Sequence, residues 1–213
     1  MIWLKQGIAE DDLAGKGPLA GNLYPTGDTG GHVDEFCRFA SADTILLATV
    51  SPEERDSDPV MRISYDRMEE SYRILQAAID QDGHKLKIIR VPVADRISLT
   101  KTLTANDKGE LAFFATKPGQ PLTALVAASY LNFFVSNDVV LVPAYGKESQ
   151  PASTKGKDAK VKQIFQRVFP TRTIIPIQSE DLHYGGGGMH CATQEQPTAE
   201  DENLQNARSP LIR

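Results

Sequence analysis

An internal repeat is the feature that most constrains the fold of this chain. The segment 43–48 (DTILLA) and the segment 138–143 (DVVLVP) share one pattern, an aspartate in a turn followed by an apolar run, at an offset of 138 − 43 = 95 residues. In both copies another expected strand precedes this run, and a loop, an amphipathic stretch and a further apolar run follow it. The sequence therefore predicts an α/β fold built from repeated ββαβ units.

The first copy of the repeat predicts four elements. We expect strands over 32–39, 44–49 and 86–93, and a helix over 61–79 whose apolar residues recur at helical spacing. Gly83 should end this helix, because glycine readily adopts the left-handed conformation that follows a helix C-terminus.

The second copy predicts the same order of elements. Strands are expected over 129–135, 139–144 and 173–177, and the helix over 158–169. The glycine-rich stretch that follows the last of these strands stands where another unit would begin.

Three stretches lie outside the two copies. Residues 2–4 read as a buried strand directly after Met1, so we expect about two full units plus flanking parts of others. Residues 5–31 contain seven glycines and no periodicity, which predicts a long loop. Residues 95–128 show turn signals but no clear element. We take 1–197 as one partial domain and 198–213 as a polar, disordered tail.

Charge and cysteine content narrow the functional classes. A net charge of −5 and a pI near 5.4 argue against nucleic acid or an anionic membrane as partners. No leader and no long apolar run are apparent. The two cysteines, Cys37 and Cys191, form no CxxC pair, so a reactive thiol in a reducing compartment, the cytoplasm, is expected rather than a disulfide.

Cys191 follows a run of four glycines, 185–188. Glycines let a backbone approach a ligand closely, so we expect Gly188 to lie against a substrate and Cys191 to be presented for chemistry. Two alternatives stay open. The glycine tract could be a flexible linker, and Cys191 could be packed in the interior as a small hydrophobic residue.

A cysteine nucleophile needs an acid or base partner. His32 and Asp34 are two residues apart, so a strand would place them on one face and Glu35 on the other. The alternative without a catalytic role is a histidine in a strand that forms a hydrogen bond with a neighbouring aspartate. A structural zinc site is disfavoured because the histidines and cysteines lack paired spacing, and no cofactor is expected.

Four segments resemble the agmatine deiminase and bacterial-type peptidyl-arginine deiminase family, of the guanidine-modifying pentein superfamily. They are 31–39 (GHVDEFCRF), 128–133 (ASYLNF), 140–146 (VLVPAYG) and 185–197 (GGGGMHCATQEQP), in the family's order. The resemblance covers nearly the whole chain up to Pro197. It implies an α/β propeller of five ββαβ units.

The resemblance also implies roles for individual residues. Cys191 would attack the guanidinium carbon as thiolate, His32 would protonate the departing ammonia and then activate water, and Asp34 would grip the guanidinium. Asp28 would lie near the amine end of the substrate. The implied substrate is agmatine, converted to N-carbamoylputrescine and ammonia in polyamine biosynthesis, or a peptidyl arginine.

This sequence departs from the family pattern in one important respect. Family members carry a second guanidinium-binding carboxylate in an earlier segment that these 213 residues do not contain. We therefore expect weak or absent turnover and a tendency to form homo-oligomers or aggregates. The alternative reading is a catalytically incomplete pentein that acts only in binding or assembly.

Overall fold

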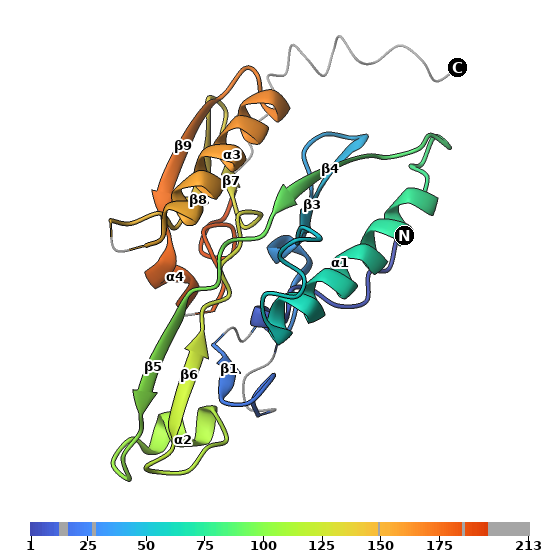
Figure 1. Ribbon diagram of the computed structural model, residues 1–213. Helices are drawn as coiled ribbons and strands as arrows, with labels where there is room; N and C mark the ends of the chain where they lie inside the picture. Colours follow the sequence, from blue (N-terminus) through green and yellow to red (C-terminus); the bar gives the residue numbers. More distant parts are fainter. Residues whose placement is uncertain (13–16, 27–28, 149, 185, 196–213) are drawn as a thin grey trace, which may run out of the picture.

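The computed structural model describes residues 1–12, 17–26, 29–148, 150–184 and 186–195. These residues form three small sheets of three strands each, and helices pack alongside the sheets (Figure 1). The sheet with β5 and β6 forms one end of an elongated molecule, together with α2.

The first sheet contains β2 (Cys37–Phe39), β3 (Thr44–Thr49) and β4 (Lys87–Pro92), in that order. β2 pairs antiparallel with β3, and β3 pairs parallel with β4. The crossover between the parallel strands runs through α1 (Pro59–Ala77). This is a ββαβ unit.

The second sheet repeats that topology with β7 (Phe134–Val135), β8 (Val139–Ala144) and β9 (Thr173–Gln178). β7 and β8 are antiparallel, and β8 and β9 are parallel. The crossover helix is α3 (Ala152–Val168). The predicted strands 44–49 and 139–144 coincide with β3 and β8.

A third sheet was not predicted from the sequence. Its order is β1 (Leu23–Pro25), β6 (Pro121–Leu125) and β5 (Ser98–Thr102), with β6 parallel to β1 and antiparallel to β5. The short helix α2 (Lys108–Phe113) connects β5 to β6. β5 is mostly exposed, which weakens the periodic signal that a sequence would show.

Helix α1 begins where its sequence requires it to begin. The side chain of Asp58 accepts hydrogen bonds from the backbone N–H groups of Val60 and Met61, and Pro59 occupies the first helical position. The helix ends at Ala77, before the predicted glycine stop. Gly83 instead lies in the turn before β4, with a φ of +84°.

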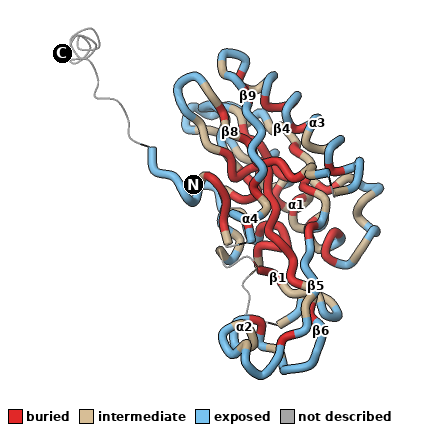
Figure 2. Tube along the Cα trace, turned by 90° about the vertical axis from the view of Figure 1, so that its left-hand side faces the viewer, coloured by how far each residue is buried: buried red, intermediate tan, exposed pale blue. Residues whose placement is uncertain are grey.

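One hydrophobic core joins the two ββαβ sheets. Phe133, the last residue of an irregular buried segment, packs edge to face against Phe165 of α3, with ring centroids 4.9 Å apart. Figure 2 shows that buried residues follow the central strands, whereas the end that carries α2 is largely exposed. The core therefore holds the segments of the two units in fixed relation.

Three sequence predictions were wrong in detail. Residues 2–4 form no strand, and Trp3 is 77% exposed. Residues 33–35 form the 3₁₀ helix η2 (Val33–Glu35), so the expected strand begins only at Cys37. Residues 129–133 are buried but irregular, because their carbonyl and hydroxyl groups serve tertiary hydrogen bonds rather than a strand ladder.

The remaining elements are short. The 3₁₀ helix η1 (Ala9–Asp11) lies within the long N-terminal loop, and α4 (Glu180–Tyr184) follows β9. Among the described residues, no helix combines the length and apolar character needed to span a bilayer. The predicted tail 198–213 lies outside the described residues.

Candidate active site

The glycine tract places Cys191 at the surface on a tightly turned backbone. Gly187 has a φ of +89°, and a Cβ atom there would stand 3.1 Å from Sγ of Cys191. At Gly188 a Cβ atom would stand 2.5 Å from Nε2 of His183 and 2.6 Å from Oδ1 of Asn132. Both positions exclude a larger residue. Cys191 itself is exposed.

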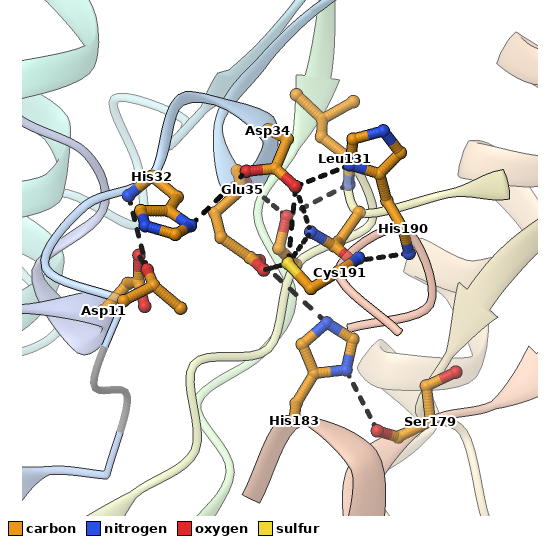
Figure 3. A network of polar contacts seen from close by, with 12 residues as sticks. Asp11, His32, Asp34, Glu35, Leu131, Ser179, His183, His190 and Cys191 are labelled. Atoms are coloured by element: carbon orange, nitrogen blue, oxygen red, sulfur yellow. Dashed lines mark hydrogen bonds and ion pairs between the residues drawn. The ribbon is translucent and has the colours of Figure 1, made fainter. Parts of the chain in front are cut away.

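The short helix η2 directs Asp34 toward this cysteine. Sγ of Cys191 donates a hydrogen bond to Oδ2 of Asp34 at 3.3 Å. Nδ1 of His32 lies 4.0 Å from the other carboxylate oxygen, Oδ1. Figure 3 shows His32 on one side of Asp34 and Cys191 on the other. The structure thus brings together the three residues that the sequence singled out as catalytic candidates.

Asn132 is fully buried and contacts both the Asp34 carboxylate and the Cys191 thiol. Its Nδ2 donates to Oδ2 of Asp34 at 3.0 Å and to Sγ of Cys191 at 3.2 Å. Its Oδ1 accepts hydrogen bonds from the backbone N–H groups of His190 at 2.8 Å and of Cys191 at 3.3 Å. One amide therefore sets the position of both the thiol and the carboxylate.

His190 is a fourth residue in contact with the Asp34 carboxylate. Its Nδ1 lies 2.6 Å from Oδ2 of Asp34. Burial alone would raise the pKa of Asp34, but the hydrogen bonds from His190 and Cys191 outweigh burial and hold the pKa below its ordinary value. Asp34 is therefore an anion at neutral pH.

The two cysteines have different environments. Burial raises the pKa of Cys37 to about 12, so its thiol stays protonated. Burial, and then the negative charge of Asp34, also raise the pKa of Cys191, although hydrogen bonds from the backbone of Gly188 and from Asn132 oppose the shift. Without a bound cation, Cys191 is a thiol.

A buried carboxyl group lies beneath the site. Glu35 is fully buried; its Oε1 lies 3.8 Å from Sγ of Cys191, and its Oε2 has no hydrogen-bond partner among the described residues. Oε2 lies 4.0 Å from Nε2 of His183 (Figure 3). Burial, reinforced by the charges of Asp11 and Asp34, raises the pKa of Glu35 to about 9. Glu35 is therefore a neutral acid at pH 7.

His183 supports the cysteine loop from below. Its Nδ1 lies 2.9 Å from the carbonyl oxygen of Ser179, which fixes Nδ1–H as the donor and leaves Nε2 as an acceptor. Burial lowers the pKa of His183 to about 4, so the ring is neutral. Its Nε2 faces Gly188, which explains why that position is a glycine.

Sequence reasoning placed some of these residues and missed others. Period two predicted Glu35 on the face opposite Asp34, which is wrong, because a 3₁₀ turn directs both carboxyl groups toward Cys191. Asn132 and His190 were not assigned to the site. Asp28 lies outside the described residues, and Gly188 lies against protein groups, His183 and Asn132.

A signal for Asn132 was present in the sequence. An asparagine inside the apolar run 129–135 needs hydrogen-bond partners when it is buried, and buried polar residues of this kind gather at functional sites. Its partners could not be inferred, because they lie up to 98 residues away in the sequence.

The same centre offers a set of potential metal ligands. A ring nitrogen of His32, a carboxylate oxygen of Asp34 and the sulfur of Cys191 all lie within 4.8 Å of one another. A second set, Asp80, Asp82 and His84, lies in the exposed turn before β4. Neither set has the four ligands of a structural zinc site.

The sequence of this chain is similar to the sequences of known deiminases. A family model described as Porphyromonas-type peptidyl-arginine deiminase matches residues 19–197. Agmatine deiminase of Medicago truncatula is 30% identical over 198 residues, which are 92% of this chain and 44% of the relative. Agmatine deiminase of Pseudomonas aeruginosa is 28% identical over 197 residues, with the same coverage.

A solved structure of agmatine deiminase from Enterococcus faecalis has a similar fold. Its TM-score is 0.61 at 24% identity, over 92% of this chain and 44% of that chain. The chain thus spans less than half the length of the relatives it matches. Because the family model covers 197 − 19 + 1 = 179 of the 213 residues, this chain belongs to the Porphyromonas-type peptidyl-arginine deiminase family.

Proposed function

We propose that this site removes ammonia from a guanidinium group by hydrolysis, through a covalent intermediate on Cys191. The observation that carries the proposal is the contact between the Cys191 thiol and the Asp34 carboxylate at 3.3 Å, with His32 beside the same carboxylate. A thiol, an anion and an imidazole at one exposed point are the groups that such a reaction requires.

Asp34 has the charge and geometry to bind the substrate. A guanidinium is a planar cation whose N–H groups pair with carboxylate oxygens. Asp34 is an anion held from behind by Asn132 and His190. A cation bound against Asp34 would lie beside Cys191, and its charge would favour the thiolate over the thiol. Substrate binding would therefore activate the nucleophile.

The chemical steps follow from these positions. The Cys191 thiolate forms an S–C bond to the guanidinium carbon, and one C–N bond breaks as ammonia leaves with a proton from His32. Water then adds to the same carbon, with His32 taking a proton, and the C–S bond breaks. The products are a ureido compound and the free thiol.

The proposed substrate is agmatine, which would give N-carbamoylputrescine and ammonia. The names of the curated relatives support agmatine, and the name of the family model supports an arginine side chain as the second candidate. We also propose that the three sheets belong to a propeller of ββαβ units, since two of them share strand order and direction.

Labelling with a haloacetamidine, a cationic reagent that mimics a guanidinium, tests the site. We expect one label per chain, slowed by agmatine more than by an arginine peptide. Cys191→Ser should abolish the labelling, whereas Cys37→Ser, the matched control, should leave it intact. Labelling that follows Cys37, or that agmatine does not slow, would overturn the proposal.

A further inference from the structure

We propose that His32, Asp34 and Cys191 form a binding site for a thiophilic divalent cation, of which Zn²⁺ is the best match, and that this cation reversibly closes the site. Metal binding itself is independent of the proposed function. Only the consequence, a blocked nucleophile, rests on it.

The donor atoms suit zinc in kind. An imidazole nitrogen, a carboxylate oxygen and a thiolate sulfur are all zinc ligands, and three protein ligands with a fourth position for water are the arrangement of open zinc sites. Asp34 and the thiolate form of Cys191 together carry two negative charges, which balance the charge of the cation. Magnesium and calcium are disfavoured because they prefer oxygen ligands only.

The donor atoms of His32, Asp34 and Cys191 lie within 4.8 Å of one another, close to the spacing that zinc needs. A tetrahedral zinc ion with bonds of about 2.0–2.3 Å keeps neighbouring ligand atoms roughly 3.3–3.8 Å apart. The 3.3 Å from Oδ2 of Asp34 to Sγ of Cys191 falls in this range. Nδ1 of His32 lies 4.0 Å from the other oxygen, Oδ1, so His32 must move closer to share an ion with them. The His32 side chain is 61% exposed, so its ring can rotate closer without displacing a packed neighbour.

The surroundings hold two of the ligands in place. Asn132 donates to Asp34 and to Cys191, and His190 contacts Asp34. Such outer contacts orient metal ligands and tune their affinity. Exposed Cys191 and exposed His32 leave a path for the ion from solvent. On binding, the S–H bond of Cys191 breaks, an S–Zn bond forms and the proton passes to the buffer.

The second acidic set lacks these properties. No thiol is present among Asp80, Asp82 and His84, so this set offers only carboxylate oxygens and one imidazole. This cluster carries no proposal, but it provides an internal control for adventitious binding at an exposed Asp/His set.

The test is a titration of the metal-free chain with Zn²⁺ in competition with a chromophoric zinc indicator. We expect one tight equivalent. Removing a residue that only supports a ligand typically lowers metal affinity by about 10- to 100-fold, and removing a ligand itself should lower it at least as much. Cys191→Ser should therefore weaken zinc binding by at least about 100-fold, and His32→Ala and Asp34→Asn by at least about tenfold. His84→Ala and Cys37→Ser should leave the affinity within about twofold of the wild-type value.

Two further readouts identify the ligands. Co²⁺ should give a sulfur-to-cobalt charge-transfer band that disappears in Cys191→Ser. Zn²⁺ should block haloacetamidine labelling, and a chelator should restore it. Binding that survives Cys191→Ser, or that is lost in His84→Ala or Cys37→Ser, would overturn the site. Because His32 is exposed, a loss in His32→Ala cannot be ascribed to misfolding. Failure of labelling in metal-free protein would count against the proposed function and leave the titration intact.

Discussion

The thiol of Cys191 donates a hydrogen bond to the carboxylate of Asp34 across 3.3 Å. The same contact has opposite effects in two states of the site. In the free protein, the negative charge of Asp34 adds to burial in opposing ionisation of the thiol. Once a cation lies between the two groups, the thiolate and the carboxylate both interact favourably with it. The pair therefore couples ionisation of the nucleophile to the arrival of a cationic substrate.

This coupling predicts a crossover in the reactivity of Asp34→Asn. Burial still raises the pKa of Cys191 in the variant, but the contribution from the Asp34 charge is gone. In metal-free buffer, alkylation by neutral iodoacetamide should become faster, by about tenfold for each unit by which the thiol pKa falls. Labelling by a cationic haloacetamidine should become slower, because its binding partner is lost.

The control for that experiment is Asp138→Asn, which removes an exposed carboxylate from the turn before β8. Both reagents should modify this variant at the wild-type rate. If Asp34→Asn changes the two rates in the same direction, Asp34 does not couple cation binding to thiol ionisation.

Asn132→Ala should damage both the site and the fold. The change removes the side-chain acceptor of the Cys191 backbone N–H and one of the two acceptors of the His190 backbone N–H, and it releases Asp34. Unsatisfied buried groups cost about 1–3 kcal/mol of unfolding free energy. We expect that loss in chemical denaturation, together with loss of haloacetamidine labelling. Asn137→Ala, in an exposed turn, should change neither measurement.

Gly188→Ala should displace the cysteine loop. The added methyl group would stand 2.5 Å from Nε2 of His183, which is buried and cannot move away. We expect slower labelling of Cys191 and a lower melting temperature. Gly156→Ala is the matched control, because a Cβ atom there meets nothing within 4 Å. Within helix α3 that change should stabilise the fold by about 0.5–1 kcal/mol. Equal effects of the two substitutions would contradict this account of the loop.

Glu35→Gln should make folding stability less sensitive to alkaline pH. The pKa of Glu35 rises from 4.5 in an exposed chain to about 9 in the folded protein, chiefly through burial. Between these values the unfolded chain releases a proton that the folded chain keeps, so wild-type stability falls as pH rises. Glutamine has nearly the same shape and does not ionise, so the variant escapes this loss.

Denaturation of metal-free protein between pH 5 and pH 9 measures the effect. The stability of Glu35→Gln relative to the wild type should increase with pH, by at most about 1.4 kcal/mol per pH unit. Glu148→Gln, the same change at an exposed residue, is the matched control. A flat difference for Glu35→Gln would mean that Glu35 is ionised in the folded protein.

The sequence predicted the parts of the fold that local signals determine. Apolar runs after Asp43 and Asp138 marked β3 and β8 correctly, because a turn residue followed by branched apolar residues leaves few alternatives. The same kind of signal failed at residues 129–133, where a buried apolar run proved irregular. Burial can be inferred from composition, whereas the hydrogen-bond partners that decide between strand and irregular chain lie elsewhere in the sequence.

The candidate site also contains residues that local sequence predicted and residues that it did not. Cys191, His32 and Asp34 could be named from local context, and the structure brings them together. Glu35 was placed on the wrong side, because period two holds only for extended chain and residues 33–35 form a 3₁₀ turn. The closeness of Glu35 to His183, at 4.0 Å, joins residues 183 − 35 = 148 positions apart, which no local pattern could show.

The most direct test of the central claim is mass spectrometry of the chain after acid quenching of a reaction with agmatine. We predict an adduct of agmatine less ammonia on the peptide that contains Cys191, in the wild type and in Cys37→Ser, with a ureido product appearing slowly as the adduct decays. An adduct on another residue, product formation by Cys191→Ala at the wild-type rate, or the absence of both adduct and product would contradict the claim that Cys191 deiminates a guanidinium.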